Sequence, residues 1–185
     1  MNRPFADKRP IGPIVMSSGG DSAGLRVYHT TSKSNLDQIR DDGLRGSIST
    51  GKTDKVEKAM ELTRPEKYPS RLNAVFAYED SGVAQSSEKG DIVISFDASK
   101  APCAGYGVRA GSGLMGIADL VLKMGKAPDN PRVKAGSREV WEEDIEGPIR
   151  TQQDLQEVNS RFDFGSIQEI YFPCDIPPDI IKVER

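Results

Sequence analysis

Two reactive side chains lie near opposite ends of this 185-residue chain, each in a short run typical of a β-strand. His29, the only histidine, lies in RVYHTT at residues 26–31, and Glu169 lies in IQEIYF at residues 167–172. β-branched and aromatic residues dominate both runs, which favours strands. A carboxylate held by a rigid strand can stabilise positive charge that develops on a substrate. We therefore expect the two strands to pair, so that His29 and Glu169 share one cleft.

A compact helix is predicted directly after His29, at residues 35–42. Ser34 is a residue type that caps helix N-termini, and Gly43 is the type that ends helices. Leu36 and Ile39 are three residues apart, the spacing of one buried helix face. The strand, helix and glycine stop form one short block at the start of the chain.

This opening block resembles ADP-ribosyltransferase-like domains, in which a strand ending in His-x-Thr precedes a short helix that carries Asn-Leu and stops at Gly-Leu. The closing block resembles the same superfamily, and the DarT-type nucleic-acid ADP-ribosyltransferases in particular. In those proteins a late strand carries the key glutamate and a proline-containing tail follows; here the tail is IPPDII at residues 176–181. The likeness covers roughly residues 25–50 and 165–183.

The resemblance implies that the substrate is NAD and that Glu169 is catalytic. Cleavage of the nicotinamide–ribose bond builds oxocarbenium character on the ribose, which the matching glutamate stabilises while it orients the 2′-hydroxyl. By the same resemblance His29 binds the adenosine ribose, and Thr30 or Thr31 supplies a backbone or hydroxyl contact.

Four further positions are expected to bind NAD. Gly43 and Leu44 belong to the matching motif at the end of the helix. Tyr78, at the end of a predicted strand, is the candidate for a ring that stacks on nicotinamide, although a core role is the simpler interpretation. Arg71 is a candidate pyrophosphate clamp, because a guanidinium forks onto phosphate oxygens, and a solvated loop arginine is the alternative.

A second motif points to a different function. Residues 46–53 read GSISTGKT and match the G-x-x-x-x-G-K-[ST] formula of a phosphate loop, with Lys52 as its lysine. A true phosphate loop follows a buried strand, whereas the charged segment 38–45 precedes this one. Asp97 is the only acidic residue placed at all suitably for magnesium. A phosphate-loop hydrolase is therefore a remote alternative.

Composition limits the remaining choices. The net charge of −3 and a pI near 5.3 provide no global basic field that would argue for a nucleic-acid partner. Cys103 and Cys174 lack the spacing of a metal site. We interpret them as free thiols in a reducing cytoplasm and expect no metal cofactor. Trp141, followed by EED at residues 142–144, reads as a solvated acidic segment rather than a metal or partner site.

The chain length suits one domain at residues 25–185. Residues 1–24 are rich in proline, glycine and serine and are predicted to be a flexible N-terminal arm. Pro13 interrupts the best apolar stretch of this arm, so neither a signal peptide nor a membrane span is predicted, and we expect a cytoplasmic protein.

Strand and helix patterns alternate irregularly, which predicts an α+β domain with a split, mostly antiparallel sheet and flanking helices. The apolar run at residues 91–97 is expected in the middle of a sheet. Thr151 and Asp154 form the pattern of a helix capping box. Further strands are predicted at 25–28 and 73–78, a helix at 54–62, a buried helix at 114–124 and a loop at 126–137.

The resemblance implies NAD-dependent ADP-ribosyl transfer to a protein or nucleic acid, or NAD glycohydrolysis, by a toxin-like enzyme. An inhibitory or antitoxin protein is a conceivable partner, and no membrane partner is expected. The main alternative is a non-catalytic ligand- or partner-binding domain of the same fold.

Overall fold

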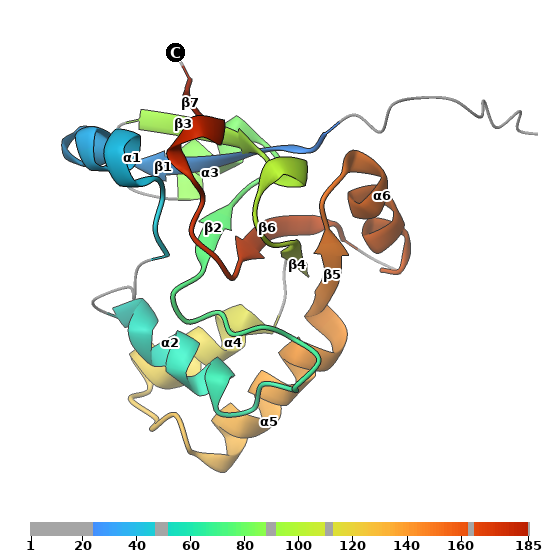
Figure 1. The fold of residues 1–185 in the computed structure, drawn as a ribbon. Helices are drawn as coiled ribbons and strands as arrows, with labels where there is room; N and C mark the ends of the chain where they lie inside the picture. Colours follow the sequence, from blue (N-terminus) through green and yellow to red (C-terminus); the bar gives the residue numbers. More distant parts are fainter. Residues whose placement is uncertain (1–23, 47–51, 88–91, 110–112, 163–164, 185) are drawn as a thin grey trace, which may run out of the picture.

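The computed structural model describes residues 24–46, 52–87, 92–109, 113–162 and 165–184, and it shows the expected α+β domain with two antiparallel sheets (Figure 1). The three-stranded sheet has the order β1-β3-β7, with β1 at Arg26–Thr31, β3 at Ile92–Asp97 and β7 at Ile181–Val183. The four-stranded sheet has the order β2-β6-β4-β5, with β2 at Val75–Ala77, β6 at Ile167–Phe172, β4 at Gly105–Arg109 and β5 at Ile145–Ile149.

Helices flank the sheets at both ends of the molecule. Their bounds are α1 Leu36–Asp42, α2 Lys52–Glu61, α3 Ser81–Ser87, α4 Leu114–Ala118, α5 Pro131–Glu139 and α6 Gln152–Ser160. Two π-helical turns extend α4 and α5, namely η3 at Asp119–Lys123 and η4 at Val140–Asp144. Figure 1 shows α1 beside the three-stranded sheet, α6 beside β5, and α2, α4 and α5 together below the four-stranded sheet.

The strand β3 lies in the middle of its sheet, as its apolar run predicts. It pairs with β1 on one side, where His29 faces Ile94, and with β7 on the other. Ile94 and Phe96 are completely buried because both edges and one face of the strand are covered. This buried strand gives β1 a rigid support.

The two sheets meet where β1 lies beside the end of β2. The backbone of Tyr28 on β1 exchanges two hydrogen bonds of 2.8 Å with the backbone of Tyr78, directly after β2. Since β2 also pairs with β6, it lies between the strand of His29 and the strand of Glu169. The expected direct pairing of residues 26–31 with residues 167–172 is therefore wrong, because β1 and β6 belong to different sheets.

The start and the end of the described chain nevertheless meet at the end of α1. Leu44 and Ile176 exchange two backbone hydrogen bonds of 2.8 Å. Gly43 ends α1 as predicted, with a φ of 83° and its N–H bonded to the Ile39 carbonyl. A Cβ at Gly43 would lie 2.2 Å from the Ile176 carbonyl oxygen, so the close approach of the two segments also requires glycine.

The predicted capping role of Ser34 is wrong. A 3₁₀ turn at Lys33–Asn35 precedes α1, and Asn35 is the N-cap without a side-chain cap hydrogen bond. The Ser34 hydroxyl instead hydrogen-bonds the Ser32 hydroxyl at 2.7 Å. By contrast, the capping box of α6 is present, with Thr151 and Asp154 bonded to each other's backbone N–H.

Three further sequence expectations require correction. Residues 126–137 are not all loop, because Pro131 begins α5 behind an Asn130 N-cap. Residues 114–124 form α4 and η3 but are not buried on all sides: Met115 is 69% exposed and Met124 58%. Residues 141–144 form part of η4 and are only partly solvated, because Glu142 and Glu143 are exposed whereas Trp141 and Asp144 are buried.

Trp141 and Asp144 are both buried. The indole N–H of Trp141 donates to the Met60 carbonyl at 2.8 Å, and Nε of Arg109 donates to Asp144 at 2.9 Å. Trp141 also stacks on Tyr68, with ring centroids 5.5 Å apart. This cluster is the core that joins α2 and α5 to the four-stranded sheet.

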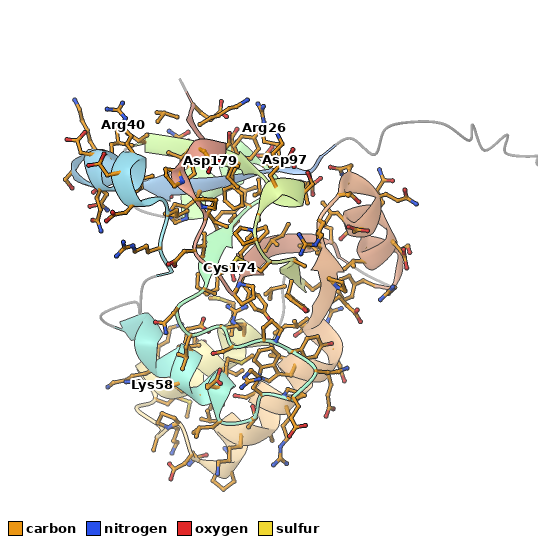
Figure 2. The ribbon with its side chains drawn as sticks, viewed as in Figure 1. Arg26, Arg40, Lys58, Asp97, Cys174 and Asp179 are labelled. Atoms are coloured by element: carbon orange, nitrogen blue, oxygen red, sulfur yellow. A yellow bond between two sulfur atoms is a disulfide. The ribbon has the colours of Figure 1, made fainter. Side chains whose placement is uncertain are left out.

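The two cysteines form a disulfide, so the expectation of free thiols is wrong. Cys103 follows β3 and Cys174 follows β6, and their Cα atoms are 6.1 Å apart. Figure 2 labels Cys174 near the middle of the molecule. The bond joins segments 71 residues apart, which no local spacing in the sequence reveals.

Two sequence predictions concern residues outside the described part of the chain. The flexible arm at 1–24 is almost entirely outside it, and so are residues 47–51 of the phosphate-loop match. In the described residues on either side of this gap, α1 rather than a buried strand precedes Gly46, and α2 begins at Lys52. Among the described residues, no helix is long and apolar enough to cross a membrane.

Candidate functional site

A cavity of about 660 Å³ opens between α1, α2, α4 and the meeting point of the two sheets. This volume lies in the usual range of ligand pockets, about 300–1,000 Å³. Seven of the eight residues predicted to act on NAD line it: His29, Thr31, Gly43, Leu44, Arg71, Tyr78 and Glu169. The predicted shared cleft is therefore present, although β2 rather than direct pairing brings the two sides together.

The imidazole of His29 is oriented by the backbone of β2. Its Nδ1–H donates to the Phe76 carbonyl at 2.7 Å, because a carbonyl oxygen accepts only. In the neutral ring this bond leaves the lone pair on Nε2, which makes Nε2 the acceptor atom. His29 is partly buried and lies on the face of β1 that lines the cavity.

The two threonines after His29 point to opposite faces of β1, because side chains alternate along a strand. Thr31 lies on the cavity side, and its hydroxyl accepts a hydrogen bond from Asn35 Nδ2 at 3.3 Å. Thr30 is buried on the other side, where its hydroxyl donates to the Ala84 carbonyl at 3.5 Å. Of the two predicted contacts, only Thr31 lines the cavity.

Glu169 lies in the middle of β6, between β2 and β4, and its side chain is 24% exposed. Arg71 Nη2 donates to Oε1 at 3.2 Å, and the Tyr78 hydroxyl approaches Oε2 at 3.5 Å, the long limit of a hydrogen bond. The carboxylate is thus held from two sides by groups that also line the cavity.

Arg71 is not a solvated loop residue, since its side chain is only 2% exposed. Its Nε and Nη2 donate to both oxygens of Glu57, at 2.9 and 3.1 Å. The guanidinium carbon lies 5.0 Å from the ring centroids of both Phe76 and Tyr171. A planar cation between aromatic rings and two carboxylates is firmly fixed.

The electrostatics of this cluster keep Arg71 charged. Burial by itself lowers the pKa of Arg71, but the charges of Glu57 and Glu169 raise it more, so the net pKa lies above its usual value. Burial also raises the pKa of Tyr171, which keeps its hydroxyl neutral. One cation and two carboxylates leave the triad of Glu57, Arg71 and Glu169 with a net charge of −1.

Tyr78 belongs to the core and also lines the cavity. Its side chain is buried and its backbone holds β1 against β2, which is a core function. The ring also lines the cavity beside Glu169. Its stacking on a nicotinamide ring stays a prediction.

An apolar wall faces the polar cluster, and sequence reasoning missed it. Leu114, Met115, Ala118 and Leu122 line the cavity from α4 and η3. Their spacing places them along one side of a helical segment, which explains why an apolar segment has exposed members: they surround a cavity instead of a core. The sequence shows that this segment is apolar, but it does not show that one side of the segment lines a cavity.

Four polar lining residues were also missed: Asn35, Gln38, Arg45 and Glu57. The sequence does not indicate that Glu57 lines a cavity, because its pairing with Arg71 depends on how α2 packs and because charged residues on a helix normally face solvent. Among the described residues, no group of three or more His, Cys, Asp or Glu side chains is arranged to hold a metal ion.

No family model matches this chain, and no curated protein or solved structure matches it. Functional inference therefore depends on the cavity and its side chains.

Proposed function

We propose that the protein cleaves the nicotinamide–ribose bond of NAD and transfers ADP-ribose to a macromolecular acceptor or to water. The observation that carries this proposal is the convergence of His29, Tyr78 and Glu169 on one cavity from three different strands or strand ends. These are the residues that the resemblance to ADP-ribosyltransferase-like domains assigned to ribose binding, nicotinamide stacking and charge stabilisation.

Glu169 supplies the chemistry in this proposal. As the C1′–N bond breaks, its electron pair leaves with nicotinamide and positive charge develops on the ribose. A fixed carboxylate stabilises that charge without reorganisation. An acceptor oxygen or nitrogen then bonds to C1′ and releases its proton to solvent. The apolar wall of α4 and η3 excludes water from one side of the sugar.

His29 binds the ribose in the ground state. With Nδ1–H donated to Phe76, the Nε2 atom accepts a hydrogen bond from a ribose hydroxyl. Arg71 acts on Glu169 rather than on the pyrophosphate, because both of its carboxylate partners lie in the same cavity. It holds the carboxylate in place.

The same ion pair favours the second candidate, a non-catalytic binding domain. A carboxylate paired with a buried guanidinium has part of its charge neutralised. Its electrostatic stabilisation of a developing positive charge is therefore weaker. The phosphate-loop alternative stays remote, because α1 occupies the place of the strand that such a loop follows.

The acceptor, and an inhibitory partner protein, stay open proposals. The disulfide favours an oxidising compartment over a reducing cytoplasm, because disulfides persist where thiols are not kept reduced. A toxin-like enzyme that works after export is consistent with both the disulfide and the proposed chemistry.

A thermal-shift titration followed by product analysis tests the proposal. NAD at millimolar concentration should raise the melting temperature, whereas ATP with magnesium should not. Mass spectrometry after incubation with labelled NAD should detect free nicotinamide together with ADP-ribose or a modified macromolecule. Stabilisation by ATP alone, with loss of all nucleotide turnover in Lys52→Ala, would instead support the phosphate-loop function.

A further inference from the structure

The cavity has one polar side and one apolar side. The polar side is formed by β1, α1 and the residues just after α1, and includes His29, Asn35, Gln38 and Arg45. The apolar side is formed by α4 and η3. A ligand with an anionic middle and aromatic ends must place its charge on the polar side, where hydrogen-bond donors are available.

Only two permanently cationic side chains line this cavity among the described residues, Arg71 and Arg45. Arg71 is committed to Glu57 and Glu169, and the resulting net charge of −1 repels a phosphate. Its remaining nitrogen, Nη1, has no hydrogen-bond partner among the described residues but is itself buried, so Arg71 offers a phosphate no exposed donor unless one of the carboxylate pairs is broken, which is strongly unfavourable. Arg71 is therefore the wrong cation for a diphosphate.

Arg45 has the opposite properties. Its side chain is 59% exposed, and the ion pair recorded for it is a surface contact of 3.3 Å with Asp42. Surface pairs of this kind contribute about 0–1 kcal/mol. An incoming phosphate can therefore compete with Asp42 for the guanidinium, and the guanidinium fork matches two phosphate oxygens.

The backbone of Arg45 is anchored on both sides. Leu44 is bonded twice to Ile176, and the Gly46 N–H donates to Asp175 Oδ1 at 3.1 Å. Gly46 also packs so closely on the Asn73 backbone that a Cβ would lie 1.6 Å from its carbonyl oxygen. An exposed side chain on a fixed backbone suits a cation that must reach into a cavity and release its ligand afterwards.

We infer that Arg45, and not Arg71, binds the diphosphate of the dinucleotide proposed above. This inference rests on the proposed function for the identity of the ligand, but the cation that it names comes from the burial and pairing of the two arginines. Asp42 acts as a competitor that occupies Arg45 when the cavity holds no phosphate.

Three variants test the role of Arg45. Arg45→Gln removes the proposed phosphate contact and should weaken ADP-ribose binding about 10- to 100-fold, the usual cost of losing a charge-assisted hydrogen bond. Asp42→Asn frees Arg45 and should tighten binding or leave it unchanged. Arg40→Gln is the matched control, because Arg40 forms the same i,i+3 surface pair with Asp37 and does not line the cavity (Figure 2).

Calorimetry with ADP-ribose, inorganic pyrophosphate and nicotinamide riboside separates the phosphate contact from the rest of the site. Arg45→Gln should lose affinity for the first two ligands and keep that of the third, and the salt dependence of ADP-ribose binding should become weaker. Wild-type ADP-ribose affinity in Arg45→Gln, an equal loss in Arg40→Gln, or no ADP-ribose binding by the wild type would each overturn the inference.

The two proposals fail in different ways. If ADP-ribose binding depends on Arg45 but no nicotinamide is released from NAD, the diphosphate site stands and the catalytic function fails. If NAD is cleaved and Arg45→Gln leaves both ADP-ribose binding and the KM for NAD unchanged, the function stands and the Arg45 site fails.

Discussion

Arg71 Nη2 lies 3.2 Å from Glu169 Oε1 and 3.1 Å from Glu57 Oε1, so a single buried nitrogen bridges the two carboxylates of the cavity. Glu57 belongs to α2 and Glu169 to β6, so the bridge also connects the helices below the four-stranded sheet with its central strands. The position of the proposed catalytic carboxylate consequently depends on how α2 packs. Stability and activity are coupled at this point.

Glu57→Gln should destabilise the fold by about 2–4 kcal/mol, because it removes one charge from a buried ion cluster. Glu61→Gln is the control on the same helix: its pair with Arg64 is partly exposed and should be worth about 0–1 kcal/mol. Denaturant unfolding of both variants measures the difference. Equal losses in the two variants would show that the buried cluster adds nothing beyond an ordinary surface pair.

Removal of the disulfide should destabilise the protein by about 4 kcal/mol, the chain-entropy value for linking residues 71 apart. The test compares denaturant unfolding of the wild type with that of the Cys103→Ser, Cys174→Ser double variant. The free energy of unfolding of the wild type in the presence of reductant should equal that of the double variant. Two thiols that react readily in the native protein without reductant would contradict the disulfide itself.

The disulfide should also influence the cavity. Cys174 is two residues before Ile176, which holds Leu44 and the cavity wall through two hydrogen bonds. We expect reduction to weaken ligand binding at temperatures where the protein is still folded. Unchanged binding after reduction would show that the contact between Leu44 and Ile176 is sufficient alone.

Local signals in the sequence predicted local structure well. The continuous apolar run of β3 indicated a central strand, Gly43 indicated the end of α1, and Thr151 with Asp154 indicated the start of α6. Each of these features depends on interactions within a few residues, for which residue type and spacing are sufficient. The presence of His29 and Glu169 at one site was also predicted.

Features that depend on distant packing were not predictable. The pairing of Arg71 with Glu57, the bond between Cys103 and Cys174 and the exposed face of Met115 all require knowledge of which segments meet. Strand pairing has the same property, because a strand's sequence specifies its two faces but not its neighbours. For this reason the expected direct pairing of the first and last strand-like runs was wrong, although their shared cleft was found.

The capping box of α6 should make stability depend on pH. Burial alone raises the pKa of Asp154. Hydrogen bonds from the backbone N–H groups of Arg150 and Thr151 lower the pKa by more than burial raises it, so the net pKa lies below the usual 3.8. A carboxyl whose pKa is depressed in the folded state stabilises the fold above its unfolded pKa. That stabilisation is lost as the pH falls through the folded-state pKa.

Asp154→Asn should therefore cost about 1 kcal/mol at pH 7 and less at pH 3, because the stabilisation by the charged carboxyl decreases once the pH is below the usual pKa of 3.8. Asp37→Asn is the control: its side chain is 95% exposed and the change should be within about 0.5 kcal/mol at both pH values. Urea unfolding at the two pH values measures the difference. A cost for Asp154→Asn that is independent of pH would mean that the cap acts through geometry and not through charge.

The last prediction separates binding from chemistry at the proposed catalytic residue. Glu169→Gln keeps the size and one acceptor of the side chain but removes the charge that stabilises the transition state. Turnover of NAD should fall about 10²–10³-fold, roughly 3–4 kcal/mol, while NAD affinity changes little. Arg71 keeps Glu57 as its bidentate partner, so the variant should still fold.

His29→Ala should weaken NAD binding at least as much as turnover, because a ribose ligand contributes in the ground state as well. Glu146→Gln is the control, since Glu146 lies on β5, pairs with Arg161 and does not line the cavity. Calorimetric binding and single-turnover rates on all three variants separate the two roles. Wild-type turnover in Glu169→Gln would make Glu169 only the ion-pair partner of Arg71, and the cavity would then be a binding site without the proposed chemistry.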